Sequence, residues 1–466
     1  MRDRILKITV IGGGAAGFFS AITCAQTYPH ARVTLLEAGR QVLAKVRISG
    51  GGRCNVTHAC FDPAVLVQNY PRGGKALRGA FTRFQPRDTV EWFASHAVNL
   101  KTEDDGRMFP VTDDSATIVN CLIRAAEGAG VKIRTGDPVV SVKKLIGNTA
   151  EIQQGNIAES DRGNTSEGDR GSTPEGGHGG RAPTSDDSLP TAANAAGKLY
   201  LASPEPAFEI ELKSGDKLKC DRLLIATGGS HSGFNWAKNL GHTIEPPVPS
   251  LFTFNISDSR IQDLAGVSVA NARVKLPEAK LEQTGPLLIT HWGLSGPAVL
   301  KLSAWGARFL HDRHYKTPVL INWVPQYKPE VLRQQLLAVK SQLAHRTIAA
   351  SCPVAIPRRL WERLISALGI DEQKRWSQLS NKTIDRLLQE LVQGEYQITG
   401  KGAFKEEFVT CGGVNLKEVD FKTMESRCCP GLFFAGEILD IDGVTGGFNF
   451  QSAWTTAWLA GNAIGL

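Results

Sequence analysis

The stretch that decides the fold is KITVIGGGAAGFFSAITCAQTYPHARVTLLE, residues 7–37. Residues 7–11 form an apolar run rich in β-branched side chains, and residues 32–36 form a second run of this kind. Between them, residues 15–25 carry small and apolar side chains at helical spacing. The order strand, helix, strand predicts the first unit of a parallel, doubly wound α/β sheet.

Three glycines, Gly12, Gly14 and Gly17, form a G-x-G-x-x-G motif where this helix begins. The first permits a tight turn, the second lets the backbone approach a pyrophosphate, and the third lets helix and strand pack closely. The helix N-terminus, with Ala15 and Ala16 in its first turn, offers N–H groups and partial positive charge to phosphates.

An acidic residue ends the second strand, as a dinucleotide site requires. Glu37, followed by Ala38, is placed to accept hydrogen bonds from the adenosine ribose hydroxyls. The unit therefore predicts dinucleotide binding over a structural glycine turn, although the motif alone does not separate NAD from FAD.

Composition narrows the class of protein. The 466 residues carry a formal net charge of +7 and are 42% hydrophobic, as in an ordinary globular protein of two or three domains. The charge suits an anionic cofactor or substrate, but it is too small over this length to predict a nucleic-acid partner. The nine cysteines include no C-x-x-C pair, so we expect no metal site and a reduced, cytoplasmic setting. No apolar run is long enough to span a membrane, and we expect a soluble protein.

The middle of the chain changes character twice. Residues 153–198 are rich in Gly, Ser, Thr, Asp and Pro with a degenerate eight-residue repeat, which predicts a disordered insertion; a docking segment is the alternative. We expect an FAD domain's first part at 1–240, a β-rich domain at 241–326, a helical domain at 327–398 and the FAD domain's second part at 399–466.

Three further stretches carry a family resemblance: ISGGGRCN (48–55), ATGG (226–229), and GLFFAGEILD (431–440) with GGFNFQ (446–451). With the N-terminal motif they resemble the bacterial aminoacetone oxidase-like flavoproteins, also called BaiN-type NAD(P)/FAD-dependent oxidoreductases. The resemblance covers nearly the whole chain outside 153–198. It implies FAD as cofactor, a glutathione-reductase-type Rossmann domain built from both chain ends, and inserted β-rich and helical domains.

The resemblance also implies cofactor-binding residues in the first of these stretches. Consecutive glycines let the loop run against a flat ring or a pyrophosphate, and nearby cations offset phosphate charge. A surface turn with solvated cations is the alternative. Cys54 is a redox candidate beside this loop, although a small buried packing residue is the favoured interpretation. The residues assigned here are Lys45, Gly51, Gly52, Arg53, Cys54 and Asn55.

Further residues follow from the resemblance in the other stretches. A carboxylate near Glu437 binds ribityl hydroxyls, and the amides that open the last helix point at the flavin edge where negative charge collects on reduction. Val139 would meet the adenine through its backbone, or is an ordinary strand valine. The residues assigned are Val139, Thr227, Gly228, Gly436, Glu437, Asp440, Gly447, Phe448, Asn449 and Phe450.

The leading hypothesis is an FAD-dependent oxidoreductase acting on a small molecule, such as an amine, an amino ketone or an unsaturated carbonyl compound. The sequence identifies neither the catalytic residues nor the electron donor or acceptor. His291 and Lys405 are pocket candidates, and His291 alternatively caps the helix that Pro297 begins. The alternatives are a non-enzymatic flavin-binding sensor or scaffold, and a flavoprotein acting on RNA.

Overall fold

A seven-stranded sheet joins the two ends of the chain. The computed structural model describes residues 4–145, 207–402 and 409–466, and this sheet has the strand order β20-β21-β22-β10-β1-β2-β6. The five strands from β22 to β6 are parallel, and β20 and β21 add an antiparallel edge. The strands are β1 (Lys7–Ile11), β2 (Arg32–Glu37), β6 (Lys132–Thr135), β10 (Arg222–Ile225), β20 (Val419–Asp420), β21 (Glu425–Ser426) and β22 (Leu432–Phe434).

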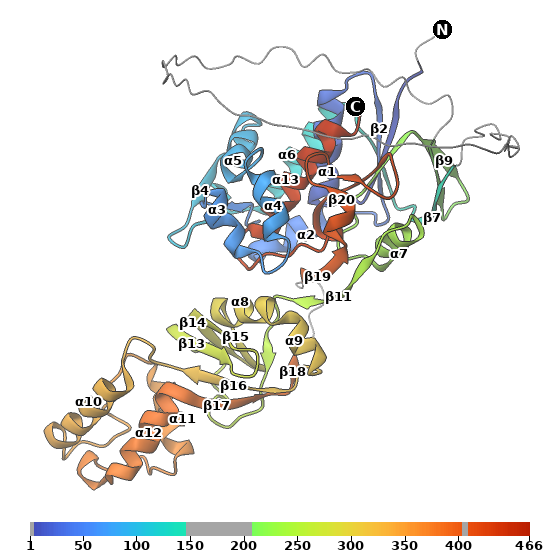
Figure 1. The fold of residues 1–466 in the computed structure, drawn as a ribbon. Helices are drawn as coiled ribbons and strands as arrows, with labels where there is room; N and C mark the ends of the chain where they lie inside the picture. Colours follow the sequence, from blue (N-terminus) through green and yellow to red (C-terminus); the bar gives the residue numbers. More distant parts are fainter. Residues whose placement is uncertain (1–3, 146–206, 403–408) are drawn as a thin grey trace, which may run out of the picture. The chain divides into compact units, whose positions relative to one another are not determined.

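Helices from both chain ends pack together beside this sheet. Figure 1 shows α13 (Phe448–Ala463, red) alongside α1 (Ala15–Thr27, blue). The approach is close because a Cβ added at Gly461 would lie 2.7 Å from the Cβ of Thr23. The other helices of this part are α2 (Ala44–Ile48), α3 (Pro63–Leu66), α4 (Gly74–Phe81), α5 (Pro86–Ser95), α6 (Ser115–Gly128) and α7 (His231–Asn239). The α/β fold built from both chain ends is confirmed.

Three small antiparallel sheets accompany the parallel one. Their strand orders are β7-β8-β9, β3-β5-β4 and β11-β19. The strands are β3 (Thr57–His58), β4 (Leu100–Thr102), β5 (Arg107–Pro110), β7 (Val139–Lys144), β8 (Phe208–Leu212), β9 (Lys217–Cys220), β11 (Ile244–Ser250) and β19 (Val409–Val414).

The segment inserted between the two halves of the parallel sheet contains a second seven-stranded sheet, which is antiparallel. Its order is β17-β16-β13-β14-β15-β12-β18. The strands are β12 (Phe254–Asn255), β13 (Ser268–Leu276), β14 (Leu281–Thr290), β15 (Gly293–Ser295), β16 (Thr317–Asn322), β17 (Gly394–Ile398) and β18 (Gly400–Lys401), with helices α8 (Pro297–Trp305) and α9 (Ala307–Asp312) between β15 and β16.

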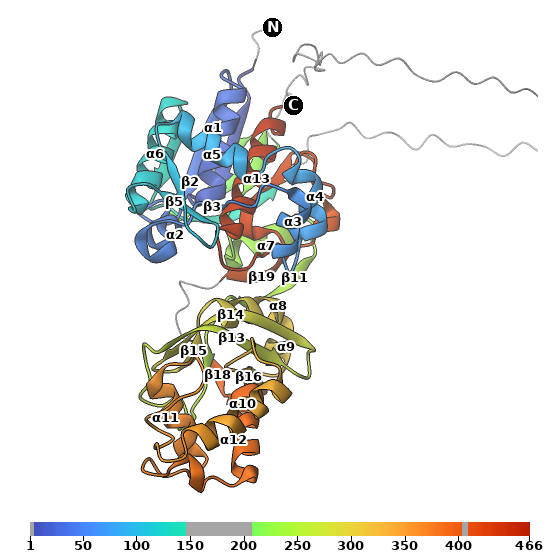
Figure 2. The same ribbon diagram turned by 90° about the vertical axis from the view of Figure 1, so that its left-hand side faces the viewer.

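Three helices form an excursion between β16 and β17: α10 (Pro329–Gln342), α11 (Arg358–Ala367) and α12 (Asn381–Gln393). Figure 2 shows them grouped beside the strands of the antiparallel sheet. Buried side chains of the sheet, such as Ile321, belong to the same hydrophobic cluster as Leu364 of α11 and Leu387 of α12. The helices and the antiparallel sheet therefore share one core, separate from the core around the parallel sheet.

Residues 394–398 differ from the helical pattern expected up to residue 398. They form β17, because Gly394, Tyr396 and Ile398 alternate as buried positions and pair with β16. The division into these four segments, with its three boundaries, stays a prediction. Lys405 and the insertion 153–198 lie outside the described residues. No helix in the described ranges is long and apolar enough to cross a membrane.

Candidate functional site

The glycine turn after β1 is built by contacts that only glycine allows. A Cβ at Gly12 would lie 2.3 Å from the carbonyl oxygen of Ala226, and a Cβ at Gly17 would lie 1.8 Å from the carbonyl oxygen of Gly12. Gly14 is different, since a Cβ there would meet no heavy atom within 4 Å. The first and third glycines of the motif are thus needed for packing, and the second leaves space beside the start of α1.

Glu37 closes this turn from β2. Its Oε2 accepts a hydrogen bond from the backbone N–H of Gly13, and its Oε1 accepts one from Gly39, each at 2.7 Å. Each carboxylate oxygen keeps one further acceptor position. Glu37 therefore holds the turn and can still accept a hydrogen bond from a ligand hydroxyl.

A cavity of about 640 Å³ opens beside the turn. This volume lies in the range of cofactor pockets. Twelve of the residues predicted to bind the cofactor line it: Gly12, Gly14, Ala15, Ala16, Glu37, Lys45, Gly51, Thr227, Gly228, Glu437, Asn449 and Phe450. Residues from both ends of the chain thus meet around one cavity.

The Ser49–Gly52 turn forms one wall of this cavity. Gly50, Gly51 and Gly52 have φ of 59°, 70° and 86°, a left-handed backbone that favours glycine. A Cβ at Gly51 or Gly52 would meet no heavy atom within 4 Å. The loop therefore presents bare backbone to the cavity, as a flat ring or a pyrophosphate requires.

The polar residues after these glycines hold the loop in place. Arg53 pairs with Glu103 at 2.6 Å and Asp113 at 3.4 Å, and its guanidinium lies over the ring of Phe109. The amide of Asn55 is oriented so that its oxygen accepts a hydrogen bond from the N–H of Gly447 at 2.9 Å. Asn55 thereby ties the loop to the start of α13.

Cys54 is buried, and burial raises the pKa of its thiol to about 12. A thiol with this pKa is protonated at neutral pH and is a poor nucleophile. The environment of Cys54 therefore favours a packing role over a redox role.

Two residues from distant parts of the chain pair with each other in the wall of the cavity. Lys45 Nζ pairs with Glu437 Oε2 at 2.8 Å, and Glu437 Oε1 accepts a hydrogen bond from the N–H of Thr410 at 3.0 Å. Thr227 Oγ1 is buried and has no hydrogen-bond partner among the described residues. An unpaired buried hydroxyl costs free energy unless a ligand satisfies it.

The start of α13 completes the site. Gly447 precedes the helix with φ of 92°, and a Cβ there would lie 2.4 Å from the carbonyl oxygen of Thr57. Asn449 makes two hydrogen bonds to the backbone of Gly443, at 2.8 and 2.9 Å. No side chain of the described residues caps α1 or α13, so the amides of both first turns are available to a ligand.

Eleven predicted residues do not line the cavity: Gly17, Ala38, Gly52, Arg53, Cys54, Asn55, Val139, Gly436, Asp440, Gly447 and Phe448. Several of them make packing or ionic contacts outside the lining of the cavity. Gly436 has φ of 76° and packs against Ala16, and Phe448 stacks on the imidazole of His58 with ring centroids 4.7 Å apart. Burial raises the pKa of the Asp440 carboxyl, whose ion pair with Arg308 is long at 3.8 Å.

Other lining residues were not predicted, among them Gln41, Leu43, Ile48, Ile441, Thr445, Ser452 and Ala453. Leu43 is the most informative, because it has φ of 59° and its N–H donates to the carbonyl oxygen of Gly13 at 2.8 Å. A leucine in the left-handed region gives no signal in the sequence.

These features fit a dinucleotide. The space beside Gly14 and Gly51, the uncapped α1 and the unpaired Thr227 hydroxyl form a cradle for a pyrophosphate between two ring systems. The N-terminal end of α13 adds a second partial positive charge at the same cavity.

Comparison with known proteins agrees with this geometry. Residues 6–178 match the HI0933-like protein Rossmann domain, and residues 248–409 match the HI0933-like protein barrel and H2TH domain. The chain is 30% identical over 465 residues to a ribosomal RNA dihydrouridine synthase of Escherichia coli K12, covering 96% of this chain and 95% of that protein. The chain belongs to the HI0933-like family. The resemblance to BaiN-type flavoproteins is confirmed.

Another relative of this HI0933-like protein has a different name. The chain is 26% identical over 467 residues to a 3-dehydro-bile acid delta(4,6)-reductase of Clostridium scindens, with 98% of each chain covered. Among solved structures, a 3-ketosteroid-delta4-(5alpha)-dehydrogenase from Rhodococcus jostii RHA1 matches with a TM-score of 0.46 and 11% identity, over 99% of this chain and 97% of that one. A likeness of this degree says nothing about the substrate. The family establishes that the chain is an FAD-dependent oxidoreductase and that FAD is its cofactor.

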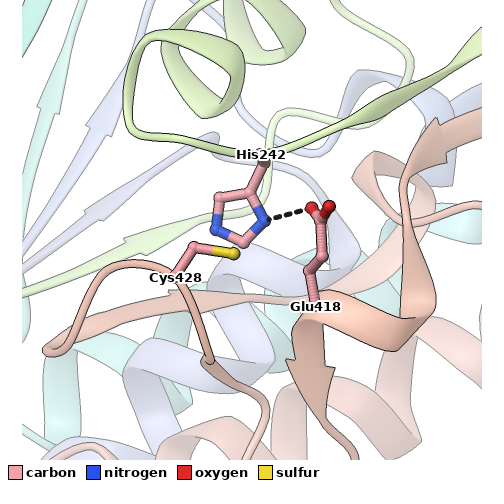
Figure 3. A group of neighbouring side chains, drawn as sticks. All are labelled: His242, Glu418 and Cys428. Carbon is pink, nitrogen blue, oxygen red and sulfur yellow. Dashed lines mark hydrogen bonds and ion pairs between the residues drawn. The ribbon is translucent and has the colours of Figure 1, made fainter.

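A separate group of His242, Glu418 and Cys428 has three potential metal ligands within 4.8 Å of one another (Figure 3). Its hydrogen bonds already use both ring nitrogens of His242. Ser426 Oγ accepts from the N–H groups of Cys428 and Cys429, so its own hydrogen is donated to His242 Nε2 at 2.8 Å. His242 Nδ1 then carries the proton and donates to Glu418 Oε2 at 3.1 Å. We infer a structural role for this group.

His291, predicted as a pocket residue, lines a second cavity of about 730 Å³ in the antiparallel sheet region. It does not line the cavity beside the glycine turn. It follows β14 and lies outside α8, whose N-cap is Gly296. The structure thus places His291 in a cavity wall, away from the start of that helix.

Proposed function

We propose that this HI0933-like protein is an FAD-dependent reductase that saturates a C=C bond conjugated to a carbonyl group, and that its substrate is uridine in ribosomal RNA. The observation that carries the proposal is that the names of two relatives describe the same kind of reaction, the reduction of a C=C bond conjugated to a carbonyl group. Dihydrouridine differs from uridine by two hydrogens across C5=C6, which is conjugated to the C4 carbonyl. A delta(4,6)-reductase of a 3-dehydro bile acid acts on C=C bonds conjugated to the C3 carbonyl.

The choice of RNA over a steroid is supported by identity and by charge. The relative named for ribosomal RNA is 30% identical over 96% of this chain, against 26% for the bile acid reductase. The segment 327–398 contains 11 Lys and Arg against 7 Asp and Glu, so it carries more than half of the net charge of +7. A local basic excess is what binding to phosphates requires.

The chain's own residues have defined tasks in this proposal. Bound FAD supplies the hydride chemistry. Glu37 and the first turn of α1 would hold the adenosine and pyrophosphate, and the bare backbone of Gly51 would let the cofactor lie against the loop. The N-terminus of α13 places a partial positive charge at the cavity, where it stabilises negative charge that develops on a ligand.

The test is a direct assay for the reduced nucleoside. Ribosomal RNA from a strain that lacks the gene is incubated with chemically reduced holoprotein, digested and analysed by mass spectrometry for dihydrouridine. A 3-keto-delta(4,6) bile acid is assayed in parallel with the reduced holoprotein, and an amino ketone is assayed with the oxidised holoprotein, whose flavin can accept two electrons. The Gly14→Ala variant serves as a control defective in FAD binding. Dihydrouridine formed by the wild-type protein alone supports the proposal.

Each other outcome has a defined meaning. Reduction of the bile acid without any dihydrouridine would overturn the RNA substrate and keep the bond class. Oxidation of the amino ketone as the sole reaction would overturn both.

A further inference from the structure

A tryptophan is displayed at the tip of the hairpin that joins β14 and β15. The turn consists of His291 and Trp292, since Thr290 pairs with Gly293. Trp292 is 66% exposed, more than any other large hydrophobic side chain in the described ranges. Single exposed hydrophobic side chains are common on protein surfaces, so the surroundings of this indole decide what it can bind.

The backbone at this tip is firmly held. The carbonyl oxygen of Trp292 accepts a hydrogen bond from the N–H of Ile256 at 2.9 Å, and the Trp292 N–H donates to Thr290 Oγ1 at 3.3 Å. Gly293 has φ of 146°, and a Cβ there would lie 2.3 Å from the carbonyl oxygen of Phe254. The backbone of the tip is therefore packed against β12, so binding of a ligand to the indole has to order only the side chain.

The cavity of about 730 Å³ lies beside this indole. Most of its wall is polar, with the side chains of Asn255, Ser257, Asp258, Gln262, Asp263 and Thr290. A polar wall next to one aromatic face suits a nucleobase, which stacks through its ring and forms hydrogen bonds at its edge. It suits a steroid poorly, because a steroid would have to bury apolar surface against these groups.

Arginines lie at the same wall. Arg359 of α11 donates to the carbonyl oxygen of Asp263 at 2.6 Å, and Arg363 pairs with the Asp263 carboxylate at 3.2 Å. The other wall carboxylate, Asp258, is bound by Arg260. Arg260 also pairs with Glu390, and Arg358 pairs with Glu362, so the charges around this wall balance as a whole. The local excess of positive charge lies at Asp263, where Arg359 and Arg363 face one carboxylate.

We propose that Trp292, Arg359 and Arg363 form a docking site for single-stranded RNA. One base stacks on the indole, and the two arginines contact the flanking phosphates. The site rests on the proposed function, because an RNA substrate must be held while its uridine is reduced. It deepens that function by assigning the partner's contact surface to the β14–β15 hairpin and α11.

The test measures binding of a fluorescein-labelled single-stranded RNA dodecamer of mixed sequence to the holoprotein by fluorescence anisotropy. Loss of one stacked base weakens binding roughly 5- to 150-fold, so Trp292→Ala should raise the Kd about tenfold or more. Trp292→Phe should restore most of the affinity, because it keeps an aromatic face. Trp305→Ala, at a tryptophan that is 37% exposed at the end of α8, should bind as the wild type does.

The arginines are tested by salt dependence. Arg359→Gln with Arg363→Gln should weaken binding and reduce the slope of log K against log salt by about 1.4, since each phosphate contact on a single strand contributes about 0.7. The matched control is Arg313→Gln with Arg427→Gln, which removes the same charge from exposed ion pairs elsewhere. Flavin absorbance and the melting temperature verify that each variant is folded and loaded.

Three results would overturn the docking site. The first is a Trp292→Ala protein that binds the RNA within twofold of the wild type. The second is a Trp292→Ala protein that reduces uridine more slowly at saturating RNA but keeps the Kd of the wild type, which would place Trp292 in the active site. The third is a wild-type protein that forms dihydrouridine yet does not bind the dodecamer, and this would leave the proposed function standing without the site.

Discussion

Replacing Gly14 and Gly17 separately by alanine distinguishes cofactor binding from packing in the glycine turn. A Cβ at Gly17 would lie 1.8 Å from the carbonyl oxygen of Gly12, whereas real Cβ atoms essentially never approach closer than 3.0 Å. The backbone would have to move by the difference, about 1.2 Å. A Cβ at Gly14 would project into open space.

The expected magnitudes follow from this contrast. Overpacking against a rigid backbone costs up to about 3 kcal/mol, which lowers the melting temperature of the Gly17→Ala apoprotein by about 3 °C, because the entropy of unfolding is about 2.1 cal/mol/K per residue over 466 residues. Gly14 has φ of −88° and ψ of −170°, a conformation open to alanine, so the Gly14→Ala apoprotein should melt like the wild type. Its methyl group would obstruct a charged hydrogen bond worth about 1.5–3 kcal/mol, raising the Kd for FAD roughly 10- to 150-fold.

The assay combines thermal unfolding of the apoproteins, followed by circular dichroism, with fluorescence titration by FAD. Gly79→Ala in α4 is the matched control, because its Cβ also meets no heavy atom within 4 Å but it does not line the cavity. A Gly14→Ala protein that binds FAD within threefold of the wild type would refute the placement of the pyrophosphate beside α1.

Three further predictions concern the acid of the turn, a buried histidine and the electron donor. Glu37→Gln should weaken FAD binding about tenfold and leave FMN binding unchanged, because FMN has no adenosine ribose; an equal loss for both in fluorescence titrations would mean that Glu37 only holds the turn. Burial lowers the pKa of His242, so below its ordinary value of about 6.5 the unfolded chain takes up a proton first and the free energy of unfolding falls. Urea unfolding at pH 7.5 and 5.5 should show this loss in the wild type and less of it in His242→Asn, and identical losses would contradict it. NADH and NADPH should reduce the flavin slowly without a partner, because the sequence holds one G-x-G-x-x-G and no second; rapid saturable bleaching in anaerobic stopped-flow mixing would disprove this.

Local patterns were enough to predict the parallel sheet and a dinucleotide cofactor. The spacing of Gly12, Gly14 and Gly17 and the apolar runs around them depend on neighbours within about 30 residues, where periodicity and turn chemistry are informative. Linking the chain's two ends required more, and the resemblance supplied it through the stretches at 48–55 and 431–451.

Contacts between distant residues could not be predicted in this way. Arg53 was expected to offset phosphate charge, but its partners in the structure are Glu103 and Asp113. Lys45 was assigned the same task and pairs with Glu437, 392 residues away. An exposed cation looks the same in a sequence whether it faces a ligand or a carboxylate, since only the fold decides which one is near.

The net charge of the whole chain does not test for a local binding surface. The value of +7 is averaged over 466 residues, and the expectation of no nucleic-acid partner that was drawn from it stays a prediction. Electrostatic interactions fall off within about 10 Å in salt solution, so a binding surface depends on the local excess and not on the total. The excess of Lys and Arg in residues 327–398 is seen only when the charge of each segment is counted separately. Helix α11 of this segment contacts Asp263 in the wall of the second cavity.

The division of the molecule into two hydrophobic cores offers a reason why one family contains enzymes named for such different substrates. The residues that line the cofactor cavity belong mainly to the parallel sheet and its helices. In contrast, Trp292 lies in a hairpin of the antiparallel sheet, and α11 packs into the hydrophobic core of that sheet. Substitutions on a surface above one core leave the packing of the other unchanged, since distant sites act independently. Under the proposed function, a member of the family can keep its cofactor site while the antiparallel sheet and its helices adapt to a nucleobase or to a steroid. On this reasoning the segment between β11 and β19 determines the substrate specificity of each member. Exchange of that segment between two members should therefore transfer the substrate specificity from one to the other.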